Sequence, residues 1–224
     1  LTGPLAVQAT VQYAVTGGSA DDSGVDYTLT SGTLTFAAGV TTQDISIPVV
    51  NDTIYEGAGE TITLNLSSPS GVTLGGQSTH AHTITDDDGA PVITFNQATA
   101  NSNENAGSVN IQVDLSNASA SNVVVDYSVT GGTASGAGVD YTLTSGTFTF
   151  TAGQTVKNIS IAIIDDGISE LTETVQVTLA NPTGGTVGTP GVHTHSIIDN
   201  ETLPTLNFAA ANASTGEATA SQTI

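Results

Sequence analysis

Carboxylate side chains are the groups in this sequence whose type and spacing indicate chemistry. The chain has 21 acidic residues, one basic residue besides its histidines, Lys157, and no cysteine. Sixteen acids belong to a pattern of acidic positions that the internal repeats share near expected strand ends: Asp26, Asp52, Glu56, Glu60, Asp86, Asp87, Asp88, Glu104, Asp140, Asp165, Asp166, Glu170, Glu173, Asp199, Glu201 and Glu217. If they converge on one end of a folded unit, bound cations must offset their repulsion. The alternative, a solvated acidic surface, does not require charges at matched positions.

The ligand chemistry favours calcium. Carboxylate oxygens without a nearby thiolate select a hard cation, and ligands from several loops suit the variable coordination of Ca²⁺ better than the octahedron of Mg²⁺. Eight of the acids lie in one repeat, from Glu104 to Glu201. Since each Ca²⁺ takes about six to eight oxygens, the sequence predicts about two or more ions per complete repeat.

The elements that must position these acids belong to a repeat of about 113 residues. Tyr13–Glu56 aligns without a gap with Tyr127–Glu170, and 27 of the 44 positions are identical. Residues 1–89 are expected to form a first repeat that lacks its first strands, and residues 90–203 a complete second repeat. Residues 204–224 match the first strands of a third repeat.

Each repeat is predicted to be a small β-sandwich. Apolar residues alternate with polar ones, as in Ile159, Ile161 and Ile163, which is typical of half-buried antiparallel strands. Glycine-rich breaks separate about seven short strands per repeat, and no stretch has the pattern of an amphipathic helix. Because Pro48 lacks an N–H, we expect the strand Ile45–Val50 to lie at a sheet edge or to turn this residue to an unpaired side.

The acidic pattern resembles that of the Calx-β domain family over the entire repeat. The resemblance is carried by Asp165-Asp166-x-x-x-Glu170-x-x-Glu173, by Asp140-Tyr141 upstream, by Asp199-Asn200-Glu201, and by Glu104 within Asn-Glu-Asn-Ala-Gly. It implies tandem seven-stranded immunoglobulin-like sandwiches that bind several Ca²⁺ ions at one end, as in modules of many bacterial surface proteins. The matched acids would be the ligands.

The sequence departs from the family pattern at individual ligand positions in both repeats. Asn200 replaces an acid in the terminal triplet of the second repeat. The first repeat has Asn51 in place of the leading aspartate, and Glu60 comes one residue late. These changes are expected to reshape individual subsites without removing either cluster.

Composition and motifs disfavour several other functions. One Lys against 21 acids argues against nucleic acid and anionic membranes, and no apolar run is long enough to span a bilayer. Catalysis is not expected, because no nucleophile and base pair up and the dense carboxylates fit metal ligation better than hydrolysis. His80 and His82, like His193 and His195, are two residues apart on the expected last strand. They could hold a transition metal, but without a third ligand an ordinary surface or cross-strand position is favoured.

Two functions from different classes fit this sequence. The first is an extracellular structural repeat of a bacterial filament, matrix or adhesin stalk, in which Ca²⁺ stiffens repeats and junctions. The second is a calcium-sensing module that regulates an adjacent domain. Similar consecutive repeats and short linkers favour the first, whose partners would be other copies of the chain, head to tail. Contacts with a cell surface or carbohydrate stay open.

The phase of the repeats suggests how copies could join. The first repeat lacks counterparts of Val92–Val113, whereas Thr205–Phe208 and Glu217–Ile224 match parts of that stretch. This segment could complete the first repeat of the next chain by strand complementation, which would also deliver Glu217 to its acidic end. Alternatively, the sequence is a window on a longer covalent array.

Overall fold

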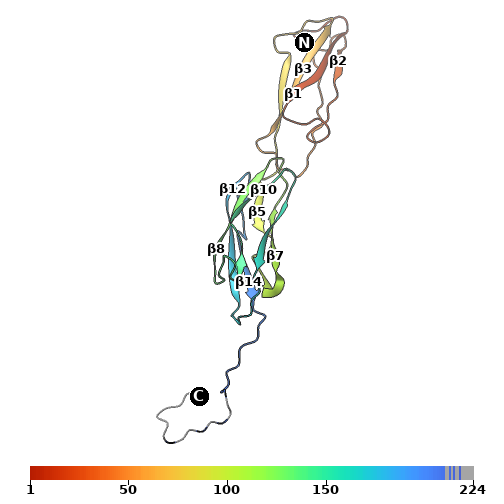
Figure 1. Ribbon diagram of the computed structural model, residues 1–224. Coiled ribbons are helices and arrows are strands. Elements are labelled where there is room, and N and C mark those ends of the chain that lie inside the picture. Colours follow the sequence, from red (N-terminus) through yellow and green to blue (C-terminus); the bar gives the residue numbers. More distant parts are fainter. Residues whose placement is uncertain (210–211, 213, 215–216, 218–224) are drawn as a thin grey trace.

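The computed structural model describes residues 1–209 together with residues 212, 214 and 217. Within that part of the chain all regular elements are strands except for a 3₁₀ turn, η1 (Glu104–Ala106). No helix there is long and apolar enough to cross a membrane. Figure 1 shows the two repeats end to end, with the last segment leaving the second repeat on the side away from the first. The predicted all-β class is confirmed.

The second repeat is a sandwich of two five-stranded sheets, β10-β8-β12-β14-β6 and β13-β5-β7-β11-β9. The first sheet consists of β6 (Thr99–Asn103), β8 (Val123–Gly132), β10 (Gly146–Phe150), β12 (Glu173–Thr183) and β14 (Val192–Ile198). The second consists of β5 (Val92–Phe95), β7 (Ser108–Leu115), β9 (Tyr141–Thr142), β11 (Val156–Ile163) and β13 (Thr186–Val187). Consecutive strands β5 and β6 lie in different sheets, so residues 92–103 complete both. β6 runs parallel to the last strand, β14.

The core of this sandwich follows from the alternation in the sequence. Ile111, Val113 and Leu115 of β7 are buried, whereas the residues between them are exposed or half-buried. They belong to one apolar cluster that also includes Phe95 and Phe150, each 1 % exposed. The predicted period of two is therefore confirmed, and removal of this apolar surface from water is the main stabilising term.

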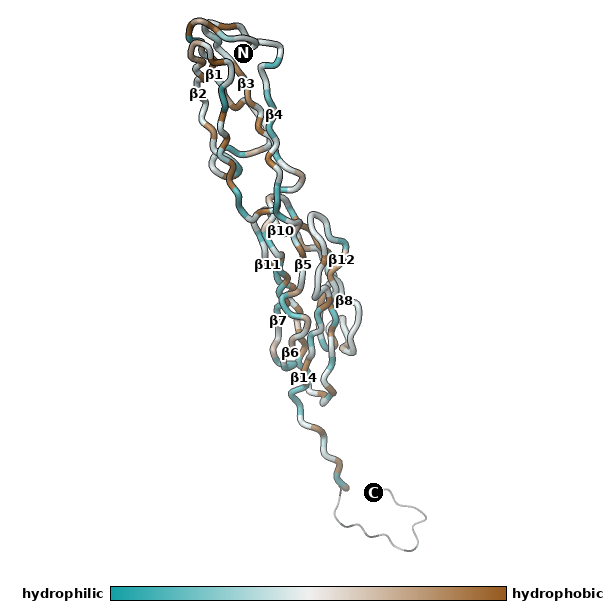
Figure 2. The backbone as a smooth tube through the Cα atoms, turned by 180° about the vertical axis from the view of Figure 1, so that it is seen from behind, coloured by the Kyte–Doolittle hydropathy of each residue, from teal (hydrophilic) through white to brown (hydrophobic). Residues whose placement is uncertain are grey.

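The first repeat has only one sheet, with the order β2-β1-β3-β4. Its strands are β1 (Ala9–Gly18), β2 (Gly32–Phe36), β3 (Glu60–Ser70) and β4 (Thr79–Ile84). In the described part of this repeat, the buried apolar residues form two small clusters, one around Phe36 and one around Ile62. Figure 2 shows apolar segments of β1, β2 and β3 in this repeat without a second sheet of strands over them.

The prediction that Ile45–Val50 forms a strand is wrong. This stretch makes only an isolated bridge, between Val49 and Tyr27. Its counterpart in the second repeat, β11, pairs along its whole length with β7. Residues 1–8 form no strand equivalent to β7, so residues 45–50 bond only with the loop at Asp26–Thr28: Val50 N donates to Asp26 O at 2.8 Å, and Thr28 N donates to Pro48 O at 2.9 Å.

A backbone contact joins the two repeats. Tyr55 N donates to Ala118 O at 2.9 Å, and Ala120 N donates to Tyr55 O at 2.9 Å. Asn117 Nδ2 also donates to the backbone oxygen of Gly89, in the linker, at 3.1 Å. These bonds hold the loop before β3 against the β7–β8 loop of the next repeat. The loop before β3 also carries Glu56.

A close backbone approach at a glycine lies next to one predicted ligand. Gly132, at the end of β8, has φ 121°, and a Cβ atom there would lie 2.1 Å from Thr174 O. Only glycine permits this approach without strain. This approach holds the end of β8 against the start of β12, whose first residue is Glu173.

Candidate metal centre

Hydrogen bonds between loops gather the acids of the second repeat at one end of the sandwich. Ile163 N, at the end of β11, donates to Gly107 O at 2.9 Å, and Ile164 N donates to Asp140 O at 2.9 Å. These bonds place η1 and the loop before β9 beside the same strand end. Glu104 Oε1 then accepts a hydrogen bond from Asp166 N at 3.1 Å. Acids from separate segments are therefore drawn together by backbone donors.

Two groups of three carboxylates result in this repeat. Asp140, Glu170 and Glu173 form one, here called the Asp140 group, and Glu104, Asp199 and Glu201 form the other, the Glu104 group. Within each group, one oxygen per residue lies within 4.8 Å of the others. Glu104 and Asp140 are buried, at 4 % and 7 % exposed. Three carboxylate oxygens at this spacing fit the oxygen-only coordination that a hard cation prefers.

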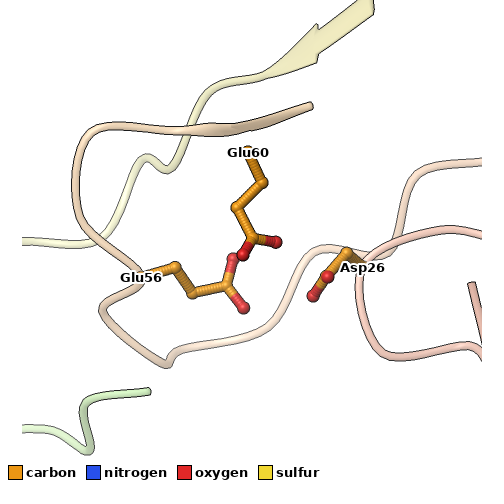
Figure 3. Close-up of side chains that lie close together, drawn as sticks. All are labelled: Asp26, Glu56 and Glu60. Atoms are coloured by element: carbon orange, nitrogen blue, oxygen red, sulfur yellow. The ribbon is translucent and has the colours of Figure 1, made fainter. Parts of the chain in front are cut away.

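The first repeat contains one such group, Asp26, Glu56 and Glu60, here called the Asp26 group. These residues are the counterparts of the Asp140 group. Figure 3 shows the carboxylates of Glu56 and Glu60 facing each other, with Asp26 pointing toward them from a neighbouring loop. Glu60 Oε2 is buried without a hydrogen-bond partner, as is Glu201 Oε2 in the second repeat. A buried carboxylate oxygen without a partner is costly unless it is protonated or binds a cation.

Equivalent aspartates connect the loops of both repeats. Asp199 Oδ2 accepts from Glu170 N at 2.9 Å, and its Oδ1 accepts from Glu201 N at 3.1 Å. Asp86 Oδ2 accepts in the same way from Glu56 N, at 2.9 Å. These donors hold the pKa of Asp199 below its usual value, mainly through the Glu201 N–H. Each aspartate therefore stays charged while it ties the end of the last strand to the loop that carries a glutamate.

The pKa values of the glutamates are shifted in the opposite direction, upward. Burial, followed by the charge of Asp26, raises the pKa of Glu56 to about 7. Burial also raises the pKa of Glu60 and of Glu173 to about 7, and the neighbouring aspartate, Asp26 or Asp140, adds to the effect. For Glu201 the largest cause is a hydrogen bond to Asp199, which raises its pKa to about 7. With one Lys in the chain, protons or metal ions are the available means of neutralising these groups.

The other predicted ligands lie outside the three groups. Asp52 and Asp166 each accept a hydrogen bond from the N–H two residues ahead, at 2.8 and 2.6 Å. The charge of Asp165 contributes to the raised pKa of Glu201. Asp86 and Asp88 are half-buried at the end of the first repeat, and Asp87 and Glu217 are exposed. The ligand role of all sixteen acids stays a prediction.

Asp21 was not anticipated at the site. Its N–H donates to Asp26 Oδ2, and its charge contributes to the raised pKa of Glu60. The repeat comparison could not identify it, since its counterpart is Ser135, whose N–H makes the same bond to Asp140. The backbone donor recurs although the side chain does not.

The histidine pairs differ between repeats. His193 and His195 are buried, at 2 % and 3 % exposed. His193 Nδ1 lies 2.7 Å from Gln97 O, and His195 Nε2 lies 2.9 Å from Ser102 Oγ. Their counterparts in β4 are exposed or half-buried, because the first repeat has no strands over them. In the described residues no group of three metal ligands includes a histidine. A transition-metal site at either histidine pair therefore lacks a third ligand.

We expect the unfolding free energy of the calcium-free protein to fall as pH rises from about 4.5 to about 7. In this window the folded glutamates, with pKa raised to about 7, bind more protons than they do in the unfolded chain. Thermal unfolding in excess chelator at stepped pH measures the effect. His195, whose pKa is lowered by burial and by His193, acts oppositely below about 6.5.

The variant Glu173→Gln isolates the carboxylate contribution, since it removes one titrating group and leaves both histidines in place. The unfolding free energy of this variant is expected to fall less with rising pH than that of the parent protein. An equal or larger fall would contradict the assignment of the pH dependence to the buried glutamates.

Fold and site together define a class: tandem β repeats, of which the second is a complete two-sheet sandwich, with carboxylate groups at strand ends. A family model described as the Calx-beta domain matches residues 1–88 and again residues 86–201. The chain therefore belongs to the Calx-β domain family, as the acidic pattern predicted.

The chain is similar to two groups of known proteins. Sodium/calcium exchanger 1 of Canis lupus familiaris and that of Bos taurus are each 31 % identical to the chain over 190 residues, which is 77 % of the chain. The chain spans only 19 % of the length of these exchangers. Among solved structures, the apo-form Calx CBD1 domain is 27 % identical with a TM-score of 0.47, over 50 % of this chain and 99 % of that one. CBD12 from CALX1.2 is 22 % identical, also with a TM-score of 0.47, over 87 % and 89 %.

Proposed function

We infer that the chain is a calcium-binding structural repeat of an extracellular filament, matrix or adhesin stalk. The observation that supports this most is that one loop takes part in both the junction and a carboxylate group. The backbone of Tyr55 bonds to the next repeat, and the adjacent Glu56 belongs to the Asp26 group. An ion held by that group would fasten the loop that makes the junction. Calcium would then stiffen the chain between repeats.

Calcium fits the ligands in each group. They are carboxylates from separate loops, some of them buried and with raised pKa values, and hard cations with flexible coordination suit such sites. Three groups among the described residues support two ions in the second repeat and one in the first. Ions in all three would cancel part of a formal charge of −20. Extracellular calcium modules commonly bind at about 10⁻⁴ to 10⁻³ M.

Calcium titration by calorimetry tests the sites. The variant Glu173→Gln removes one of three carboxylates from the Asp140 group and should weaken binding there by at least about 10- to 100-fold. Asp114→Asn is the matched control, because Asp114 lies at the other end of β7 and accepts from Asn96 and Gln112. Equal affinity of both variants and the parent chain would refute the assignment.

Small-angle scattering tests the stiffening. We expect calcium to narrow the distribution of lengths of the two-repeat chain. The double variant Glu56→Gln/Glu60→Gln should remain flexible in calcium, and Asp44→Asn, an exposed acid of the same repeat outside the groups, should behave like the parent chain. No effect of calcium on the parent would contradict a structural role at the junction.

The regulatory alternative is favoured by the similarity to the sodium/calcium exchangers. In that case calcium would act at micromolar concentration and change one local surface, whereas the structural role requires only saturation near the millimolar range. The midpoint of the scattering titration separates the two functions.

A further inference from the structure

The first repeat has an apolar groove where the second repeat has strands. Two openings of about 800 and 860 Å³ lie along it. The walls include Val11, Phe36, Ile45, Leu64 and Leu66, residues whose counterparts are buried in the second repeat. Apolar residues of core type that line an open groove indicate a binding site for another segment.

The second repeat shows which kind of segment fills such a groove. There Ile93 and Phe95 of β5 are 0 % and 1 % exposed. Phe95 N donates to Pro190 O at 2.9 Å, and its ring lies 5.6 Å from that of His193. The counterparts of Pro190 and His193 in the first repeat, Gln77 and His80, line the open groove. The positions equivalent to those that contact Phe95 therefore border the groove.

A segment of this kind follows the second repeat. Pro204, Leu206 and Phe208 are the counterparts of Pro91, Ile93 and Phe95. Leu206 is 99 % exposed and Phe208 79 % exposed. Two large apolar side chains on the same side of an extended segment match, in spacing and type, the pair that β5 buries.

The acids give an independent indication of the same partner. Asp86 and Asp88 correspond to Asp199 and Glu201 of the Glu104 group, but residues 1–88 contain no counterpart of Glu104. The sequence counterpart is Glu217, nine residues beyond Phe208, the same interval as from Phe95 to Glu104. One segment thus carries both the apolar pair and the missing carboxylate.

We propose that Pro204–Ile224 of one copy inserts into the first repeat of a second copy and completes its two sheets. Residues up to Ala209 leave the second repeat on the side away from the first, so the partner groove belongs to another molecule (Figure 1). The contact joins two different surfaces, head to tail, and therefore propagates as an open filament unless the rotation between copies closes a ring. It goes beyond the proposed calcium function, because the apolar contact does not depend on an ion.

Light scattering with size exclusion over a range of concentrations tests the proposal on the 224-residue chain. The parent chain should form head-to-tail oligomers. Phe208→Asp should weaken their association by at least about 100-fold, because a charge would enter an apolar groove. Phe208 is exposed within its own molecule, so both repeats should stay folded.

The matched control is Asn207→Asp, which adds the same charge one residue away. Its counterpart Thr94 is half-buried and points to the other face of β5. Association should stay close to that of the parent chain. Equal weakening by both variants, or a parent chain that stays monomeric, would overturn the proposal. A monomeric parent would indicate that another segment, such as one preceding Leu1 in a longer chain, fills the groove.

Comparison of chelator with calcium separates this proposal from the calcium function. Strand insertion predicts oligomers in both conditions, and Glu217→Gln should reduce the number of bound ions in the oligomer without preventing association. If calcium binding fails, the dependence on Phe208 persists. If insertion fails, calcium still binds the Asp140 group.

Discussion

Removal of calcium is expected to lower the unfolding temperature of both repeats by several degrees. Each group places three carboxylates within 4.8 Å of one another, and one Lys is available to the whole chain. An ion that binds only the folded state stabilises it by about 2.7 kcal/mol at a concentration 100 times its dissociation constant. Two ions in the second repeat would therefore contribute about twice that amount. Calorimetric unfolding in calcium and in excess chelator measures the difference.

The control for this experiment is a monovalent salt at equal ionic strength, because screening alone reduces repulsion between surface carboxylates. Magnesium provides a second comparison, since its octahedral requirement fits these loops less well. Equal unfolding temperatures in calcium and in the monovalent salt would show that the acids form only a solvated surface.

Phe150→Ala is expected to destabilise the second repeat by about 3–5 kcal/mol, because it removes a buried ring and leaves a cavity. Phe150 is 1 % exposed and lies 6.3 Å from Phe148 in an edge-on arrangement. Chemical denaturation followed by tyrosine fluorescence measures the loss.

Phe36→Ala is the matched variant in the first repeat. Phe36 is 8 % exposed but borders the open groove, so water can enter the space left by its ring. We expect a loss clearly smaller than that of Phe150→Ala in the isolated chain. The two losses should approach each other in oligomers, where the groove is filled. Equal losses in the monomer would contradict an open groove.

Strands were predictable from sequence where a strand and its partner lie in the same repeat. The alternation in β7 and β11 indicated both strands, and they pair with each other. The same alternation at Ile45–Val50 did not produce a strand, because pairing is a property of two segments and one of them is missing. Local pattern therefore predicts the preference of a segment, and tertiary contact decides whether its hydrogen bonds form.

The sequence predicted which acids belong to the candidate site, but it did not predict which of them lie together in groups of three. Recurrence at strand ends identified Glu104, Asp140 and Glu173, which the structure gathers into two triads. Spacing could not show that Asp166 would turn its oxygen to the N–H of Ile168 instead. That outcome depends on loop backbone geometry, which the one-dimensional pattern does not contain. The burial of His193 and His195 likewise depends on strands distant in sequence.

The parallel pairing of β6 with β14 has a mechanical consequence. Five register pairs, from Thr194 with Thr99 to Ile198 with Asn103, join the N-terminal segment of the repeat to its last strand. Tension along a chain of repeats would pull β6 toward the preceding repeat and β14 toward the following one. Because these neighbours run in the same direction, the load would shear all of their hydrogen bonds together instead of peeling them one at a time. A chain of such sandwiches is therefore suited to bear tension along its length.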